Sequence, residues 1–274
     1  MAELVSKPLA GKRIVVTRAV EQSQPVAEAL RDAGADPFLL PLVAFTPPES
    51  FSELDDFLKT VGEYDWVFFT SQNALRAVEE RSAALGLALS HILKDAMIAA
   101  VGPATAGAIR TTGLRVAYVS HVHRGEALAE ELASEVAGRR VFLPRSDRAN
   151  PELIEALHRH GAKVRAFVAY KTVPPDADAQ RVQQTLAKGT WDAILFFSPS
   201  AVHHLSEMLG TERFRDLSAR SAFVAIGPIT EKALRAEGVD RLIVAADTTV
   251  PACLAALAEF FKAGQHQPAG AKQA

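Results

Sequence analysis

The sequence has few of the features that mark secreted, membrane or nucleic-acid-binding proteins. Cys253 is the only cysteine, which excludes an intramolecular disulfide and any metal centre built from several cysteines. The chain has 30 basic and 32 acidic residues, so its net charge is −2. A protein that binds nucleic-acid phosphates usually carries a basic surface. No segment reaches the roughly 18 consecutive apolar residues of a membrane span, and the N-terminus lacks a signal-peptide pattern. We therefore expect a cytoplasmic protein that binds neither nucleic acid nor membrane.

Motifs for common cofactors are also absent. The chain contains neither Gly-x-Gly-x-x-Gly nor Gly-x-x-x-x-Gly-Lys-Ser/Thr, which removes the main support for a dinucleotide or a nucleoside triphosphate. His121 and His123 could converge on a metal after a strand, but no cysteine or carboxylate motif accompanies them. We expect neither a cofactor nor a metal.

The chain is long enough for two domains, and its sequence is repeated once. It has 274 residues, of which 49% are apolar, enough for two cores of ordinary size. The segment ending at Arg18 matches the segment ending at Arg145, an offset of 127 residues. The Gly-Pro pair at Gly102 matches the pair at Gly227, an offset of 125 residues. Further matches follow in the same order, which indicates an internal duplication.

Short β-branched and aromatic runs alternate with longer amphipathic segments in both copies. This pattern is typical of a parallel sheet covered by helices. It predicts an α/β fold with two similar flavodoxin-like or Rossmann-like lobes. The C-terminal stretch 264–274 has little to bury, and we expect it to be disordered. The predicted strands lie near 13–18, 38–44, 65–70, 96–101, 115–119, 140–145, 164–170, 191–197, 221–226 and 241–245.

Polar loops follow the apolar strands in both copies. Ligands of parallel sheets gather beyond the carboxyl ends of the strands, where loops lead into helix N-termini. Hydroxyl and amide side chains at such places either cap the helices or bind a ligand, and the sequence leaves both alternatives open. The residues concerned are Thr70, Ser71, Asn73 and Thr105 in one copy and Ser198, Ser200 and Thr230 in the other.

Two arginines and two aspartates occupy equivalent places in the copies. Arg18 and Arg145 end the first strands, where a symmetric pair of guanidinium groups suits carboxylate or phosphate recognition. A salt bridge with Asp147 or another acid is the alternative. Asp65 and Asp192 begin their strands at the opposite edge, and a structural role in the turn is the stronger interpretation there.

A series of short motifs resembles the uroporphyrinogen-III synthase family from about Gly11 to Phe261. One position departs from the family pattern, because Ile229 stands where a threonine is common, which leaves Thr230 as the only hydroxyl there. The motifs are Val16–Arg18, Phe69–Ala74, Ala100–Ala106, Gly125–Leu128, Tyr170–Thr172, Phe197–Val202 and Ala225–Thr230.

The resemblance implies two α/β lobes with parallel sheets, joined by two antiparallel linker strands. It implies that one lobe combines 1–38 with 175–261, that the other is 48–164, and that 39–47 and 165–174 are the linker strands. The repeat by itself would also allow two sequential lobes divided near residue 128.

The resemblance also implies a cofactor-independent lyase of porphyrin and haem biosynthesis. Such an enzyme converts hydroxymethylbilane to uroporphyrinogen III, losing water and inverting the last pyrrole ring. Catalysis then consists largely of holding a flexible polyanion in the orientation that the uncatalysed reaction disfavours. Tyr170 would protonate or hydrogen-bond the departing hydroxyl, or else only pack against the linker. The implied substrate-binding residues are Arg18, Thr70, Ser71, Asn73, Thr105, Arg145, Ser198, Ser200 and Thr230.

The implied partners are the linear tetrapyrrole and, transiently, the hydroxymethylbilane synthase that produces it. The protein itself is expected to be a monomer. Two alternatives from other classes remain: a non-enzymatic two-lobed protein that binds a small polyanion, and a flavodoxin-like redox or signalling module.

Overall fold

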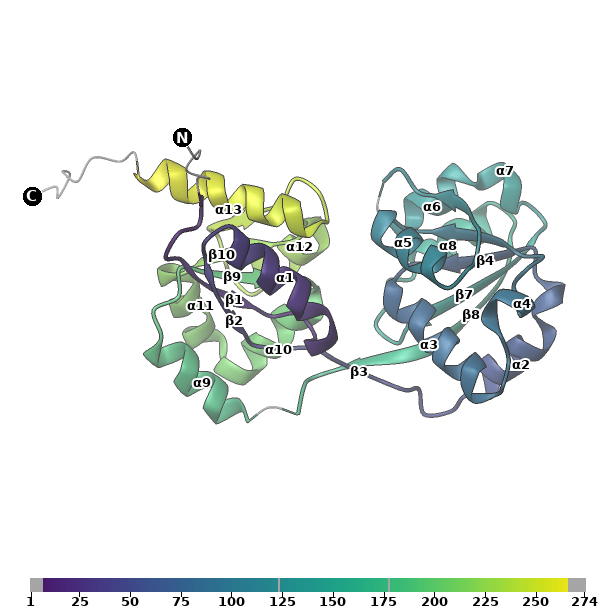
Figure 1. The fold of residues 1–274 in the computed structure, drawn as a ribbon, viewed down its shortest axis with the longest axis horizontal. Coiled ribbons are helices and arrows are strands. Elements are labelled where there is room, and N and C mark those ends of the chain that lie inside the picture. The colour runs from purple at the N-terminus through teal and green to yellow at the C-terminus, as the bar shows by residue number, and fades with distance from the viewer. Residues whose placement is uncertain (1–6, 123, 177, 266–274) are drawn as a thin grey trace, which may run out of the picture. The chain divides into compact units, whose positions relative to one another are not determined.

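Two sheets, each covered by helices on both faces, make up the described part of the chain (Figure 1). The structure is a computed structural model that describes residues 7–122, 124–176 and 178–265. One unit takes the chain up to Ala44 and from Val173 onward, and the other unit is Phe45–Thr172. The chain therefore leaves the first unit and later returns to it.

The first unit contains a five-stranded sheet in which the neighbouring strands are parallel. Its strands are β1 (Arg13–Val16), β2 (Asp36–Leu39), β9 (Ala193–Phe196), β10 (Ala222–Ala225) and β11 (Leu242–Val244), in the spatial order β11-β10-β9-β1-β2. Its helices are α1 (Val20–Asp32), α9 (Ala179–Lys188), α10 (Pro199–Leu209), α11 (Thr211–Arg220), α12 (Pro228–Ala236) and α13 (Val250–Gln265).

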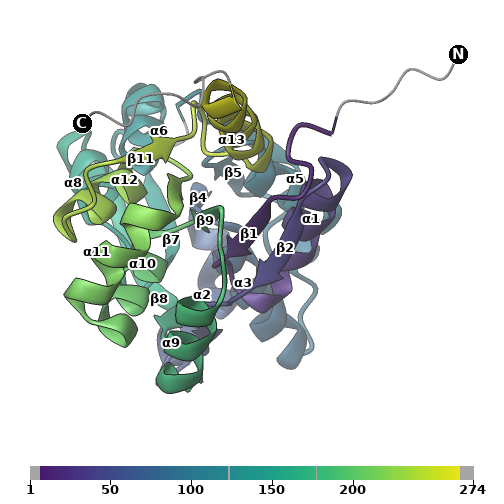
Figure 2. The ribbon, with the colours of Figure 1, turned by 90° about the vertical axis from the view of Figure 1, so that its left-hand side faces the viewer.

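Alternation along each strand gives this sheet two buried faces. Val15 packs with α9, α10, α11 and α12, whereas Ile14 and Val16 pack with α1 and α13. Figure 2 shows α1 and α13 on one side of the sheet and α9, α10 and α11 on the other. Because both faces are covered, the strands are continuous apolar runs instead of alternating polar and apolar residues.

The second unit contains a six-stranded sheet in the order β3-β8-β7-β4-β5-β6. Its strands are β3 (Ala44–Thr46), β4 (Trp66–Phe69), β5 (Met97–Ala100), β6 (Val116–Val119), β7 (Arg140–Ser146) and β8 (Lys163–Val173). Its helices are α2 (Ser52–Thr60), α3 (Gln72–Ala84), α4 (Leu89–Ile92), α5 (Pro103–Thr111), α6 (Gly125–Glu131), α7 (Ala133–Val136) and α8 (Glu152–Arg159), with a 3-10 turn, η1, at Val61–Glu63.

This sheet also separates two cores. Phe142 on β7 packs with α2, α3 and α5 and lies 4.7 Å from the ring of Phe167 on β8. Val141 and Leu143, the neighbours of Phe142, face the other way and pack with α6, α7 and α8.

The two sheets repeat one topology. The order β11-β10-β9-β1-β2 corresponds, strand by strand, to the order β6-β5-β4-β7-β8. Each sheet combines strands from both copies of the repeat, since β1 lies beside β9 and β7 lies beside β4. The predicted α/β fold with two similar parallel sheets is confirmed.

Two predicted boundaries differ from the structure. The segment 38–44 contains the end of β2 at Leu39 and the start of β3 at Ala44, not one strand. Pro41 interrupts it, because proline has no N–H to donate to a ladder. Helix α13 continues through Gln265, so the predicted disordered tail begins too early, and 266–274 lie outside the described residues.

The aspartates that begin β4 and β9 have the same structural role in the two units. The Asp192 carboxylate accepts the N–H of Arg13 at 2.8 Å, and the Asp65 carboxylate accepts the N–H of Arg140 at 2.8 Å. Each carboxylate also pairs with the basic residue that precedes the neighbouring strand. These contacts support the structural interpretation, since they hold the amino ends of adjacent strands in register.

We predict that Asp65→Asn destabilises the protein without affecting activity. The N–H of Arg140 and the charge of Arg139 lower the pKa of Asp65, although burial acts in the opposite sense. A lowered pKa contributes stability above the usual aspartate value, and that stability is lost as the pH falls through the lowered value. At neutral pH, Tm should fall by about 2–4 °C, the effect of roughly 1 kcal/mol in a chain of this size. Below that pKa, the Tm values of the variant and the wild type should converge, and a constant difference would contradict the prediction.

Candidate functional site

The carboxyl ends of β4, β5, β6 and β7 lie at one edge of the second unit, because these strands are parallel. Four loops leave this edge, and the sequence marked three of them as candidates for ligand binding. They are the loop at Thr70–Ser71, the loop at Val101–Gly102, the loop that begins at Ser120 and the loop at Asp147–Asn150.

Tyr170 is the centre of the polar contacts at this edge. Its hydroxyl lies 3.2 Å from Oγ of Ser71, and the side chains of Asn73 and Ser146 act on the pKa of this hydroxyl. Its half-buried ring makes an edge-on contact with Phe45, with centroids 5.5 Å apart. The predicted residues Ser71, Asn73 and Tyr170 therefore lie together, and Ser146, which was not among the predicted residues, pairs with Tyr170 across the strands.

Burial raises the pKa of Tyr170, and the charge of Asp147 acts in the same direction. The hydrogen bonds from Ser71, Asn73 and Ser146 oppose this shift, because they stabilise the ionised phenol. Since the pKa stays above its ordinary value, Tyr170 is protonated at neutral pH. The phenol can therefore donate a proton, and three polar side chains are in place to stabilise the phenolate that would remain.

The N-terminus of α3 connects two of the loops. Oγ of Ser71 accepts the N–H of Ala74 at 3.1 Å, so this hydroxyl caps the helix as well as touching Tyr170. The side-chain amide of Gln72 donates to the carbonyl of Ala104 at 3.0 Å. Gln72 thus joins the loop after β4 to the helix that follows β5. Thr70 is half-buried at the end of β4.

The arginine and threonine candidates of this unit differ in exposure. The half-buried Arg145 donates to the carbonyl of Ala149 in its own loop. Among the described contacts Asp147 forms no salt bridge with Arg145; its carboxylate accepts the N–H of Thr172 at 2.8 Å. Thr105 is 5% exposed, which leaves its hydroxyl little access to a large ligand.

The matching edge of the first unit holds the remaining candidates. Ser198 caps α10 by accepting the N–H of Ala201 at 3.3 Å, and Ser200 is half-buried in the first turn of that helix. Thr230 is 3% exposed in the first turn of α12. Helix capping therefore explains the presence of a serine at both Ser71 and Ser198. A role of either residue in ligand binding stays a prediction.

Arg18 lies beside this edge and contacts Gln22 and Phe197. Its Nε donates to Oε1 of Gln22 at 3.0 Å, and its guanidinium carbon lies 5.2 Å from the ring centroid of Phe197. Burial lowers the pKa of Arg18, and Cys253 acts in the opposite direction. Cys253 is buried, which raises the pKa of its thiol to about 11. The thiol is therefore neutral and unreactive at physiological pH, and the guanidinium remains the charged group.

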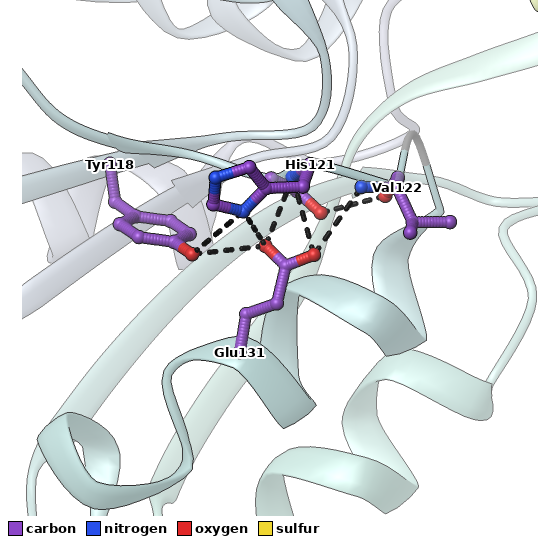
Figure 3. Close-up of polar contacts among 5 residues, drawn as sticks. Tyr118, His121, Val122 and Glu131 are labelled. Atoms are coloured by element: carbon purple, nitrogen blue, oxygen red, sulfur yellow. Dashed lines mark hydrogen bonds and ion pairs between the residues drawn. The ribbon is translucent and has the colours of Figure 1, made fainter.

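The loop after β6 is fastened by Glu131, which the sequence did not single out. Both carboxylate oxygens of Glu131 accept the N–H of His121, at 3.2 and 3.1 Å, and one accepts the N–H of Val122 at 3.3 Å. The hydroxyl of Tyr118 donates to the same carboxylate at 3.2 Å (Figure 3). Glu131 ends the helix that begins with the Gly125–Leu128 motif, so helical spacing from that motif was the only available signal.

We predict that Glu131→Gln loosens this loop. Burial alone would raise the pKa of Glu131, but the N–H groups of His121 and Val122 and two hydroxyls outweigh it and lower the pKa. The loop contacts should therefore persist above the ordinary glutamate pKa and weaken as the pH falls through the lowered value. In the variant, the His121 and Val122 amides should exchange hydrogen faster at neutral pH. Glu155→Gln on α8 is the control, and equal exchange in both variants would contradict the prediction.

One cavity adjoins Tyr170. It has a volume of about 180 Å³ and lies between β3, α3 and β8, with Phe45, Asn73 and Arg76 among the lining residues. A larger hollow of about 1030 Å³ lies at the amino edge of the first unit, with Asp192 and Arg241 in its lining. That hollow is at the opposite end of its sheet from Arg18 and Ser198, and none of the candidate residues lines it.

The described part of the chain lacks both a cluster of metal-binding side chains and a membrane-spanning helix. No group of three or more histidine, cysteine, aspartate or glutamate side chains there is placed to hold a metal ion. His123, one member of the histidine pair in the sequence, lies outside the described residues. None of the described helices is both long and apolar enough to cross a bilayer.

The sequence of this chain matches the model of a known protein family. The sequence model described as uroporphyrinogen-III synthase HemD matches residues 24–255. The chain belongs to the uroporphyrinogen-III synthase family. A uroporphyrinogen-III synthase of Synechococcus elongatus is 33% identical over 227 residues, which cover 82% of this chain and 85% of the relative. One of Chlorobaculum parvum is 24% identical and covers 92% of this chain and 100% of the relative.

Solved uroporphyrinogen-III synthases share the fold. The mutant Thermus thermophilus enzyme has a TM-score of 0.64 at 23% identity, with 94% of this chain and 100% of that chain covered. The Helicobacter pylori enzyme has a TM-score of 0.64 at 17% identity, with 91% and 99% covered. The resemblance found in the sequence is confirmed, and with it a cyclising lyase of tetrapyrrole biosynthesis in preference to a two-lobed binding protein.

Proposed function

We propose that this protein closes hydroxymethylbilane to uroporphyrinogen III and that Tyr170 donates the proton with which the terminal hydroxyl departs as water. The environment of Tyr170 is the observation that supports its role as a proton donor. A protonated, half-buried phenol lies among Ser71, Asn73 and Ser146 at the carboxyl edge of a parallel sheet. Such edges are where this class of fold binds its ligands.

The proposed steps balance in protons. The phenol gives its proton to the departing hydroxyl, and the water that leaves takes this proton, so that an electrophilic azafulvenium cation, which keeps its pyrrole N–H, remains beside the phenolate. The substituted carbon of the last ring attacks this centre, and the resulting spiro intermediate opens and recloses with that ring inverted. A proton is released when the pyrrole regains its aromaticity, and the phenolate of Tyr170 can take it back. Acid–base chemistry and orientation are sufficient for this sequence, so we propose no cofactor and no metal.

Substrate binding is proposed for both units. Arg18 in the first unit and Arg145 in the second would bind acetate and propionate side chains through charge-assisted hydrogen bonds. The hydroxyl and amide groups of Thr70, Ser71, Asn73, Ser198 and Ser200 would supply neutral hydrogen bonds. Thr105 and Thr230, whose side chains are buried, would contribute through the backbone N–H groups of their helix starts.

We propose further that the protein acts as a monomer in the cytoplasm and takes its substrate from hydroxymethylbilane synthase. The exposed large apolar residues support the first point, because they come from separate elements and include Val20 on α1, Met97 on β5 and Ile229 on α12. An interface between stable subunits would gather such residues into one patch. Light scattering on the purified protein measures the oligomeric state directly.

The function is tested by supplying hydroxymethylbilane to the purified protein and separating the isomers formed. We expect the type III isomer, without any added cofactor, and we expect a chelator to leave the rate unchanged. The type I isomer, which forms without a catalyst, is the background in a protein-free control. Recovery of the type I isomer alone would contradict the proposed function.

We predict that Tyr170→Phe slows turnover by about tenfold to a hundredfold, at the lower end for a positioned proton donor. The ring and its packing against Phe45 are kept, so Tm should change little. Tyr64→Phe is the matched control, because Tyr64 packs against Phe57 at a distance from the carboxyl edge. Steady-state rates of the two variants measure the difference. Near-normal turnover of Tyr170→Phe would limit Tyr170 to packing.

We predict that Arg18→Ala and Arg145→Ala each weaken product binding by about 1.5–3 kcal/mol, the range for a hydrogen bond to a charged group. Isothermal titration with product under anaerobic conditions measures the loss, and Tm reports on folding. Arg213→Ala serves as control, since Arg213 is exposed and hydrogen-bonds only Gln183 among the contacts described. Added salt should weaken binding by the wild type as well. If both single variants bind product as the wild type does, the carboxylate role of these arginines is wrong.

A further inference from the structure

The strand that carries Tyr170 contains a β-bulge beside it. Along β7 and β8, Arg145 pairs with Val168, but the next residue, Ser146, pairs with Tyr170. Ala169 is therefore an extra residue on β8. Bulges of this kind redirect side chains and are common next to active sites.

The bulge decides which face of the sheet Tyr170 occupies. Side chains alternate along a regular strand, so Ala169 and Tyr170 would face opposite sides. In the structure, both residues pack against the same core, the one that contains Phe167. Without the extra residue, the phenol would point to the face of α6 and α8, away from Ser71 and Asn73.

Two consecutive residues of β7 and its loop fasten the bulge. The N–H of Asp147 donates to the carbonyl of Tyr170 at 3.2 Å, and the carboxylate of Asp147 accepts the N–H of Thr172 at 2.8 Å. The hydroxyl of Ser146 lies 2.9 Å from the hydroxyl of Thr172 and donates to the Asp147 carboxylate at 3.0 Å. The backbone is thus held at Tyr170 itself and two residues beyond it.

Ser146 and Asp147, which together we call the clamp, fasten the bulge. Ser146 also lies close to the hydroxyl of Tyr170. It lies directly opposite Tyr170 in the strand pair, and its side chain lowers the pKa of the Tyr170 hydroxyl, which Ser71 approaches to 3.2 Å. We propose that Ser146 and Asp147 are positioning residues that hold the bulge at Ala169 and so aim the hydroxyl of Tyr170. This inference rests on the proposed role of Tyr170 as proton donor.

The internal repeat shows that the fold itself does not need this clamp. At the offset of 127 residues that relates Arg18 to Arg145, the first unit has Ala19 for Ser146, Val20 for Asp147 and Val43 for Tyr170. The first unit forms the same strand order without a polar side chain at any of these positions. The clamp and the phenol therefore occur together in one unit and are absent together from the other, as expected if the clamp serves the phenol.

The two clamp residues should affect the ionisation of Tyr170 in opposite directions. The hydrogen bond from Ser146 stabilises the phenolate and lowers the pKa of Tyr170, whereas the negative charge of Asp147 raises it. Ser146→Ala should therefore raise the phenol pKa, and Asp147→Asn should lower it. A residue with a purely structural role would not produce this pair of opposite shifts.

The experiment measures the ionisation of the tyrosines by NMR in the full-length protein, with the tyrosine rings labelled with carbon-13. The chain has three tyrosines, and the signal that disappears in Tyr170→Phe identifies Tyr170. Asp65→Asn is the matched control, because Asp65 also accepts a backbone N–H between strands of this unit, at the opposite edge. We expect opposite pKa shifts in Ser146→Ala and Asp147→Asn and no shift in the control.

Turnover supplies the second readout. Both clamp variants should lower kcat by about tenfold or more, since a small displacement of a catalytic group is costly, while KM changes little. Ser146→Thr retains the hydroxyl and should restore most of the rate. The inference is overturned if Ser146→Ala and Asp147→Asn match Asp65→Asn in both phenol pKa and kcat. Failure of the proton-donor role is seen separately, as normal turnover in Tyr170→Phe.

Discussion

The pairing of strands from different copies of the repeat is the interaction on which the rest of the structure depends. Ile14 pairs with Ala193 in one sheet, and Trp66 pairs with Val141 in the other. Neither copy supplies all the strands of either sheet, so each core is closed only when distant parts of the chain meet. The carboxylates of Asp192 and Asp65 fix the register of these junctions at the amino edge. The parallel arrangement then places all the candidate ligand-binding loops at the opposite edge.

The two edges of the sheets use polar groups for different purposes. At the amino edge, carboxylates are paired with basic residues and backbone N–H groups, and their role is structural. At the carboxyl edge of the second unit, the Glu131 carboxylate fastens one loop and the Asp147 carboxylate another. The neutral hydroxyls and the arginines at this edge would, on our proposal, bind the substrate. On our proposal, the second unit combines binding with proton transfer, whereas the first unit only binds, because Val43 takes the place of the phenol.

Much of the fold could be predicted from the sequence because local patterns determine it. Apolar runs located the strands, and the repeat showed that the two sheets would be alike. The segment 38–44 was the exception, since a proline inside an apolar run divides it in a way that hydrophobicity does not reveal. The loops at Ser71 and Ser198 were also found, because helix capping and ligand binding favour the same residue types.

Other parts of the site could not be predicted, because they depend on register. The bulge at Ala169 arises from the pairing of two strands, and nothing in the local sequence of β8 marks it. The sequence suggested no role for Ser146 and only a salt bridge with Arg145 for Asp147, because the contacts of these two residues with Thr172 and Tyr170 depend on how the strands pair. From the sequence alone, Glu131 resembles any exposed acidic residue on a helix, because its contacts with the loop after β6 exist only in the folded chain. Hydrogen bonds between residues far apart in the chain are results of the fold, so sequence patterns do not report them.

The central claim is that the carboxyl edges of the sheets receive the tetrapyrrole. Hydrogen exchange of the backbone amides, measured with and without product under anaerobic conditions, tests this claim most directly. The account predicts slower exchange on binding in the loops that contain Ser71, Asp147 and Ser198. It also predicts unchanged exchange at the amino edges, around Asp65 and Asp192. Protection confined to the amino edges, with the carboxyl-edge loops unaffected, would contradict the account.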